Sequence, residues 1–324
     1  MKPIFFVTKP LPDIGIDRLR RVGEVRIGKA QGSLSEKEIV AGAADCLGMM
    51  VTPAEQITKR VLDQLPQLKA ISTYSVGFNH IDVSECTRRG IGVGNTPDVL
   101  TAATAELAIT LILSVARRVI EGDRMVREGR WRGWEPVDFL GVPVVGKTLG
   151  IVGAGRIGGR VARMAAGGFD MPILYSARTA KPDLERDCNA RRAELEDILK
   201  QADFVSIHAP LTDETHHMIG ETQLQMMQPT AILVNTSRGP LIDEPALIKA
   251  LKDGTIAGCG LDVYEKEPDL APGLADLPNV VLLPHIGSAT METRSKMAIM
   301  AAENLLAAAD GKKPPHCVNP EIYP

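Results

Sequence analysis

The chain lacks the features of several protein classes. Lysine and arginine (37) nearly balance aspartate and glutamate (40), so no overall charge favours nucleic acid or a membrane surface. The longest apolar run lies near Leu107 to Ala116 and is interrupted by Thr110 and Ser114, so it cannot span a bilayer. The first apolar stretch, which begins at Ile4, is too short for the core of a signal peptide.

Paired cysteines are also absent. The five cysteines are scattered, odd in number and form no C-x-x-C pair, which is typical of free thiols in a reducing compartment. The adjacent His216 and His217 have no carboxylate or cysteine at metal-ligand spacing to complete a site. We therefore expect a cytoplasmic protein that binds no metal.

What the chain does contain is an alternation of short apolar strands with amphipathic helices. In the first hundred residues we expect strands at 4–8, 25–27, 47–51, 70–73 and 92–93. A second alternation has strands at 149–152, 173–175, 204–208, 231–235, 258–261 and 280–283. One long helix over 101–128 lies between the two, and a last helix is expected at 292–309. This order predicts parallel sheets with helices on both faces.

A glycine-rich turn follows the first strand of the second alternation. Gly153, Gly155 and Gly158 have the G-x-G-x-x-G spacing, with Arg156 and Ile157 between the last two. The first glycine permits a tight turn, the second lets the backbone approach a pyrophosphate, and the third lets the helix pack on the strand. The N-terminus of that helix offers N–H groups to phosphate oxygens. The segment therefore predicts a dinucleotide site.

The next strand of this half lacks the acid that usually ends it. In a dinucleotide fold, an Asp or Glu about twenty residues past the glycines holds the adenosine ribose. Here the strand ends in Ser176, Arg178, Thr179 and Lys181. A guanidinium and hydroxyls bind a 2′-phosphate that a carboxylate would repel. The loop thus predicts NADP(H) in preference to NAD(H), with NAD(H) possible; the alternative is a solvated basic loop that contacts nothing.

Three later segments place polar residues just beyond predicted strands. They are Arg238, Glu267 and His285, and in open α/β sheets such positions line the ligand crevice. A guanidinium matches a planar carboxylate, and an imidazole can both give and take a proton near neutral pH. Glu265 is the alternative to Glu267 as the acid, although only Glu267 directly precedes a proline.

Together these motifs resemble the D-2-hydroxyacid dehydrogenase family over essentially the whole chain. The resemblance also includes Thr73–Asp82, Asn95-Thr-Pro and His208–Thr215. Its most specific piece is Pro284–Thr290. With the basic loop, the chain is most similar to the glyoxylate/hydroxypyruvate reductase branch.

The resemblance implies a role for each motif. Arg238 would bind the substrate carboxylate, His285 would protonate the carbonyl oxygen as hydride arrives, and Glu267 would orient the imidazole. Val76 and Gly77 would offer backbone N–H groups to the substrate. The remaining substrate contact implied is Ser288, and the cofactor contacts are Gly153, Gly155, Arg156, Ile157, Gly158, Ser176, Arg178, Thr179, His208, Pro210, Thr236, Ser237, Asp262 and Gly287.

The resemblance also implies the architecture and the reaction. We expect an α/β protein of two Rossmann-like, doubly wound domains with a cleft between them. Residues 1–99 plus 288–324 would form a flavodoxin-like substrate domain, and residues 100–287 the NAD(P)-binding domain. The reaction would be NADPH-dependent reduction of a small 2-oxo acid, glyoxylate or hydroxypyruvate, to the D-2-hydroxy acid.

The sequence leaves alternatives for the substrate and for the function. The substrate could be a larger acid of the 2-ketogluconate or phosphoglycerate type, and a nucleotide-sensing corepressor shares the fold. A homodimer is expected, with its contact over Leu100 to Trp134. Trp131 or Trp134 would then be placed either in ordinary packing or at the active site of the partner subunit.

Overall fold

The structure is a computed structural model that describes residues 2–323. The chain divides into two compact units, one formed by Met1–Leu100 with Ser288–Pro324 and the other by Thr101–Gly287. We call them unit 1 and unit 2. Among the described residues, no helix combines the length and apolar character needed to cross a bilayer.

Unit 1 contains a five-stranded parallel sheet in the order β2-β1-β3-β4-β5. Its strands are β1 (Ile4–Val7), β2 (Glu24–Ile27), β3 (Gly48–Val51), β4 (Ala70–Thr73) and β5 (Gly92–Gly94). Its helices are α1 (Asp13–Arg20), α2 (Glu36–Ala43), α3 (Lys59–Asp63), α4 (Val83–Arg88) and α12 (Met291–Ala309).

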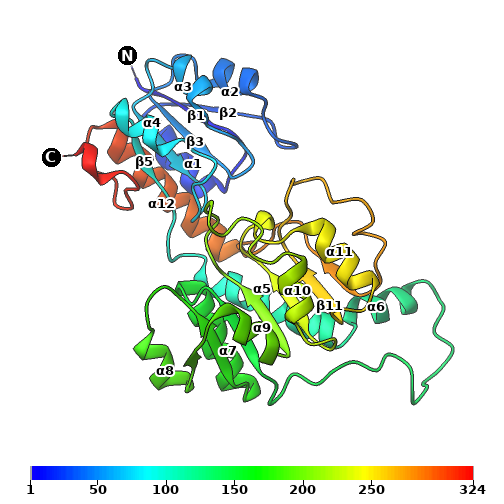
Figure 1. Ribbon diagram of the computed structural model, residues 1–324. Coiled ribbons are helices and arrows are strands. Elements are labelled where there is room, and N and C mark those ends of the chain that lie inside the picture. Colours follow the sequence, from blue (N-terminus) through cyan, green and yellow to red (C-terminus); the bar gives the residue numbers. More distant parts are fainter. Residues whose placement is uncertain (1, 324) are drawn as a thin grey trace. The chain divides into compact units, whose positions relative to one another are not determined.

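Alternate side chains of each strand pack on opposite faces of this sheet. Phe5 and Val7 belong to the core beneath α1 and α12, whereas Phe6 belongs to the core beneath α2, α3 and α4. Figure 1 shows α12 on one side of the sheet and α2 and α3 on the other. Burial on both faces explains why these strands read as short continuous apolar runs.

Unit 2 contains a seven-stranded parallel sheet in the order β12-β11-β10-β9-β6-β7-β8. Its strands are β6 (Leu149–Val152), β7 (Ile173–Ser176), β8 (Arg191–Arg192), β9 (Phe204–Ile207), β10 (Ile232–Asn235), β11 (Gly258–Leu261) and β12 (Val280–Leu282). Its helices are α5 (Thr101–Ala116), α6 (Val119–Arg127), α7 (Arg156–Phe169), α8 (Pro182–Cys188), α9 (Leu195–Gln201), α10 (Glu221–Met226) and α11 (Glu244–Lys252).

Two layers of helices cover this second sheet. One core lies beneath α9, α10 and α11 and includes Val205 and Leu233, and the other lies beneath α5 and α7 and includes Ile151 and Val234. The strands β6, β9, β10 and β11 are buried along their whole length. The α/β fold of parallel, doubly wound sheets that the sequence predicts is therefore confirmed in both units.

One expected element is wrong. The helix predicted over 101–128 is two helices, because α5 ends at Ala116 and α6 begins at Val119. Arg118 between them has a left-handed φ of 52°, which interrupts the helical hydrogen-bonding pattern. Its guanidinium lies 5.0 Å from the centre of the Phe139 ring, so the side chain turns toward the segment that follows α6.

Candidate active site

The carboxyl ends of six neighbouring strands in unit 2 are linked into one rim. Hydrogen bonds pass from each strand end to the next, as the ladder of a parallel sheet continues into the loops. They are Gly153 N–H to Ser176 O at 3.1 Å, His208 N–H to Val152 O at 2.7 Å, Ser237 Oγ to Ala209 O at 2.6 Å, Asp262 N–H to Asn235 O at 3.0 Å and Leu283 N–H to Leu261 O at 2.8 Å. The sequence-predicted site residues of unit 2 lie at this rim, most of them in loops. Ser176 is the last residue of β7, and Arg156, Ile157 and Gly158 lie in the first turn of α7.

The glycine turn has the geometry that its spacing predicts. Gly153 has a φ of 96°, and a Cβ there would lie 2.5 Å from the Ala209 nitrogen, so only glycine fits. A Cβ at Gly155 would meet nothing within 4 Å, which leaves open space beside the backbone. No side chain caps the start of α7, where Arg156 and Ile157 follow.

These residues fit a dinucleotide. The open space at Gly155 and the uncapped helix N-terminus are what a pyrophosphate needs for close backbone contact. Farther along the rim, the buried Thr236 hydroxyl has no hydrogen-bond partner among residues 2–323, and a bound polar group would supply one.

The basic loop after β7 is supported by an arginine that sequence reasoning missed. Arg178 and Thr179 are exposed, and Lys181 Nζ lies 3.4 Å from Thr179 Oγ1. Arg192 Nη2 of β8 donates to the carbonyls of Ala177 (2.9 Å) and Arg178 (3.3 Å). No periodic signal predicts a two-residue strand, so only the folded chain reveals this contact.

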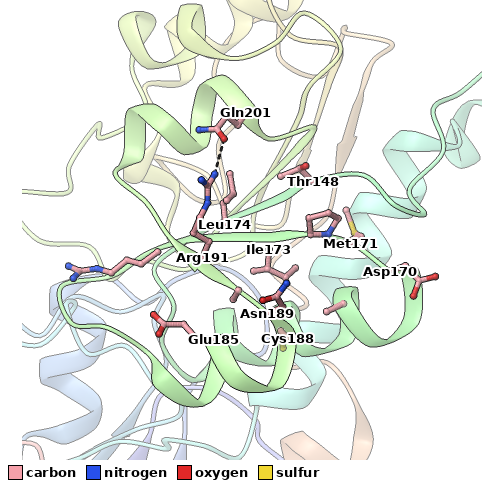
Figure 2. Close-up of a pocket in the computed structure, with 14 residues that line it drawn as sticks. Thr148, Asp170, Met171, Ile173, Leu174, Glu185, Cys188, Asn189, Arg191 and Gln201 are labelled. Atoms are coloured by element: carbon pink, nitrogen blue, oxygen red, sulfur yellow. Dashed lines mark hydrogen bonds between the residues drawn. The ribbon is translucent and has the colours of Figure 1, made fainter.

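A pocket of about 1160 Å³ lies away from the predicted cofactor and catalytic residues. Figure 2 shows it beside the amino-terminal ends of β6 and β7, with Thr148, Met171 and Ile173 in its lining. The glycine turn lies at the opposite ends of the same strands. The volume of a pocket therefore does not point to the predicted site residues in this protein.

Arg238 is held by its neighbours at the end of β10. The buried Asn235 side chain accepts the Ser237 N–H at 2.9 Å and donates to the Arg238 carbonyl at 2.8 Å. Arg238 Nη1 donates to Ser237 O at 2.6 Å. Burial lowers the pKa of Arg238, and the charge of the nearby Glu267 opposes that shift.

Glu267 and His285 form a hydrogen-bonded pair. His285 Nδ1 lies 2.7 Å from Glu267 Oε2, and Glu267 Oε1 accepts the Tyr264 N–H at 3.1 Å. Burial acts to raise the pKa of Glu267, but the hydrogen bond and charge of His285, the Tyr264 N–H and the charge of Arg238 together outweigh it, and the net shift is downward. His285 has a left-handed φ of 53°, so its loop is held in an uncommon backbone conformation.

Asp262 fixes that loop through its carboxylate. Its fully buried carboxylate accepts the Ile286 N–H at 2.7 Å through Oδ1 and the Gly287 N–H at 2.8 Å through Oδ2. Burial raises the pKa of Asp262, and the two N–H donors partly offset this. Thr104 of α5 also donates to the Gly287 carbonyl at 3.1 Å. Each oxygen of Asp262 thus holds one N–H of the loop that follows His285.

The His208 ring lies beside the turn between β9 and α10. Its Nε2 is 2.9 Å from Ser206 Oγ, and burial lowers the pKa of His208 to about 4. The ring is therefore neutral at physiological pH. Pro210 beyond it is exposed.

The predicted substrate contacts Val76, Gly77 and Ser288 belong to unit 1. Val76 and Gly77 follow β4, where their carbonyls accept hydrogen bonds from Asn95 Nδ2 (2.8 Å) and Ser75 Oγ (2.6 Å). Within residues 2–323, no group of three metal-binding side chains is found.

Comparison with known proteins identifies the family. The domain described as "D-isomer specific 2-hydroxyacid dehydrogenase, NAD binding domain" matches residues 109–287. A glyoxylate reductase of Thermococcus litoralis is 49% identical over 99% of this chain and 98% of its own length. The chain belongs to the D-isomer-specific 2-hydroxyacid dehydrogenase family. It is an NAD(P)-dependent enzyme that interconverts 2-oxo and 2-hydroxy acids, so its substrate is a small molecule.

Solved structures agree with this assignment. A protein of Thermus thermophilus is 45% identical and superposes with a TM-score of 0.91, covering 97% of this dehydrogenase and 99% of that chain. The NADPH-dependent glyoxylate/hydroxypyruvate reductase of Sinorhizobium meliloti, in complex with NADP and malonate, is 31% identical. Its TM-score is 0.88, and the coverage is 100% of this chain and 98% of that one.

Proposed function

We propose that this dehydrogenase reduces glyoxylate and hydroxypyruvate with NADPH. The observation that carries the proposal is the Glu267–His285 pair at the same rim as Arg238 and the glycine turn. The reductase names of the relatives from Thermococcus litoralis and Sinorhizobium meliloti support the choice of substrate. The match of a NAD-binding domain to residues 109–287 supports unit 2 as the cofactor domain.

In the proposed mechanism, Arg238 binds the carboxylate of the 2-oxo acid and places the adjacent carbonyl beside His285. Because His285 Nδ1 is bonded to Glu267, Nε2 is the ring atom that donates a proton to the carbonyl oxygen. When bound, the reduced nicotinamide supplies the hydride to the carbonyl carbon. Glu267 keeps the imidazole oriented and stabilises its protonated form. We further propose that Val76, Gly77 and Ser288 of unit 1 contribute substrate contacts.

The preference for NADPH is proposed from the charge of the loop after β7. Arg178 and Lys181 bring positive charge to the position where NAD-specific folds carry an acid. Glu185, an acid of α8, has its carboxyl bonded to the Tyr175 hydroxyl. Arg192 holds the Ala177–Arg178 backbone, and we propose that it preorganises this loop for a 2′-phosphate.

A substrate panel tests the proposal. Steady-state kcat/KM is measured for glyoxylate, hydroxypyruvate, 2-ketogluconate and phosphohydroxypyruvate, each with NADPH and with NADH. We expect the two small acids with NADPH to give the highest values, and hydroxypyruvate to yield D-glycerate on chiral chromatography. A preference for either larger acid, or for NADH, would contradict the corresponding part of the proposal.

We also propose that two copies of the chain associate through the segment from α6 to Val145. Its apolar side chains are exposed, Trp134 to 82%, together with Val126, Trp131, Val137 and Leu140. Figure 1 shows this segment as an extended excursion after α6 with little regular structure. Large apolar side chains gathered in one exposed segment are typical of an interface.

Analytical ultracentrifugation tests this association. We expect a dimer for the wild-type chain and a shift toward monomer for the Trp131→Ser/Trp134→Ser double variant. Val22→Ser, at an exposed apolar residue of unit 1, serves as the control and should stay dimeric. A wild-type monomer at micromolar concentration would exclude the dimer.

A further inference from the structure

Glu244 and Glu265 form a reciprocal pair. The Glu265 N–H donates to Glu244 Oε1 at 2.8 Å, and the Glu244 N–H donates to Glu265 Oε1 at 3.3 Å. We call this arrangement the 244–265 pair. Glu244 is the first residue of α11, so the pair attaches the segment after β11 to the start of that helix.

The pair brings two carboxyl groups together inside the protein. Glu244 is only 3% exposed, and burial raises the pKa of its carboxyl. Backbone N–H groups offset the cost of burying this carboxyl, because Ala271 as well as Glu265 bonds to it. The other carboxyl of the pair is bonded to a histidine, since His217 Nε2 lies 2.6 Å from Glu265 Oε1. A buried carboxyl this well supplied with donors is an anchoring point for its loop.

The anchored segment carries the acid of the Glu267–His285 pair. Glu265 and Ala271, the two residues bonded to Glu244, lie on either side of Glu267. The same segment also contacts the loop of Arg238, because a Cβ at Gly239 would lie 1.8 Å from the Tyr264 carbonyl carbon.

A further bond ties the segment to the strand that leads to His285. The Tyr264 hydroxyl donates to Leu283 O at 2.8 Å, two residues before the histidine. The segment that carries Glu267 is thus fixed against α11, the Arg238 loop and the end of β12. The contact with α11 depends on Glu244.

We propose that Glu244 is a positioning residue of the active site. Through its bonds to the segment 265–271, it sets the place of Glu267 relative to His285. The inference rests on the proposed roles of Glu267 and His285. Without the Glu244 carboxyl, the segment loses its shorter bond to α11 and keeps only the 3.3 Å bond from the Glu244 N–H to Glu265 Oε1. Displacements of the order of 1 Å near a reacting centre cost up to about a hundredfold in rate.

Charge and position can be separated by substitution. His285 is faced by Glu267 and by the charge of Asp262, and Glu267 is in turn faced by Arg238, Glu244 and His285. Glu244→Gln removes the charge of Glu244 but keeps an oxygen that can accept the Glu265 N–H. Glu244→Ala removes both.

The experiment measures the pH profiles of kcat and kcat/KM for glyoxylate with NADPH, and the Tm of each variant. For Glu244→Ala we expect kcat to fall about tenfold or more, KM to change little, and the limb that reports the catalytic acid to move to lower pH. Glu244→Gln should keep most of the activity and the wild-type profile. Glu196→Ala, an exposed acid in the first turn of α9, is the matched control and should match the wild type.

Two further variants make every outcome decisive. Glu267→Gln sets the maximal shift of the profile; if it leaves the profile unchanged, the proposed role of Glu267 fails and the inference falls with it. If Glu267→Gln acts but Glu244→Ala lowers only Tm, or if Gln and Ala at 244 behave alike, positioning by Glu244 is wrong. Should Glu244→Ala not fold, Glu265→Ala removes the other half of the pair, and an unshifted profile there would equally overturn the proposal.

Discussion

Two glutamate–histidine pairs lie at the rim of unit 2, and by local geometry they are nearly the same. The Nδ1 of His285 is 2.7 Å from Glu267, and the Nε2 of His217 is 2.6 Å from Glu265. Each histidine side chain is 38% exposed, and both have a left-handed φ. The distance between an acid and an imidazole therefore does not by itself define a catalytic site.

The two pairs differ in what surrounds them. Glu267 is affected by the charge of Arg238, and the loop of His285 is bonded at two N–H groups to the buried Asp262. Glu265 instead accepts the N–H of Glu244, so its carboxylate is hydrogen-bonded to the first residue of α11. The His285 pair leaves Nε2 for a substrate, whereas the His217 pair uses Nε2 for its acid. These neighbours support the proposed chemistry for the Glu267–His285 pair and an anchoring role for the Glu265–His217 pair.

The most direct way to break the comparison is to remove each histidine in turn. His285→Asn should lower kcat by about a hundredfold or more, because the proposed proton donor is lost. His217→Asn should lower kcat by less than about tenfold, under about 1.4 kcal/mol of barrier, since it only loosens the anchoring of Glu265. Both are measured with glyoxylate and NADPH at saturating concentrations. Equal losses in the two variants would show that the pairs are not functionally different.

Substitution of Arg238 gives the next test, since its charge acts on Glu267 and so on only one of the two pairs. Arg238→Lys keeps the charge but loses the planar fork, so kcat/KM for glyoxylate should fall by tens to about a hundredfold, with KM rising. Arg18→Lys, in an exposed ion pair with Glu303 in unit 1, is the control and should be neutral. A near-normal kcat/KM for Arg238→Lys would mean that bidentate binding is not needed.

Much of this rim is predictable from sequence, because parallel strands buried on both faces must be apolar and end in turns. All the strands expected from apolar runs occur within one residue of the predicted bounds. Arg238, Glu267 and His285 could be singled out since each follows such a strand. The glycine turn is also predictable from sequence, because the close approach of the Ala209 backbone excludes any side chain at Gly153 and so requires a glycine there.

What sequence could not predict depends on contacts distant along the chain. Nothing local distinguishes Glu265 from Glu267 except the following proline; the folded chain separates them by bonding one to His217 and the other to His285. Arg192 lies in a strand of two residues, too short to leave a periodic signal. The interruption at Arg118 was missed because the apolar spacing continues across it.

Adjacent arginines in β8 allow a sharper test of the cofactor loop. Arg192 bonds to the Ala177 and Arg178 carbonyls, whereas Arg191 bonds to Gln201 (Figure 2). Arg178→Ala and Arg192→Ala should each weaken NADPH binding about tenfold, with NADH binding nearly unchanged. Arg191→Ala is the matched control. Dissociation constants from nicotinamide fluorescence give the ratio, and an equal loss for both cofactors would refute selectivity for the 2′-phosphate.

The smallest expected effect concerns a third histidine, whose ring is bonded to a serine hydroxyl instead of an acid. The pKa of His208 is lowered from 6.5 to about 4 by burial, so between these values the unfolded chain binds a proton that the folded chain does not. Stability should therefore fall as pH drops from about 6.5 to 4 and level off below that. The loss is of the order of 1 kcal/mol, because the half-buried ring keeps some contact with solvent.

His208→Gln isolates that contribution, since an amide can still bond to Ser206 but does not titrate. The difference in Tm between this variant and the wild type should change by a few degrees across pH 6.5 to 4 and stay constant above it. Glu267 acts in a different range: its lowered pKa means that its stabilisation is present above about 4.5 and is lost as pH falls further. A Tm difference that is flat from pH 6.5 to 4 would show that solvent reaches His208 freely and that His208 does not contribute to the pH dependence of stability.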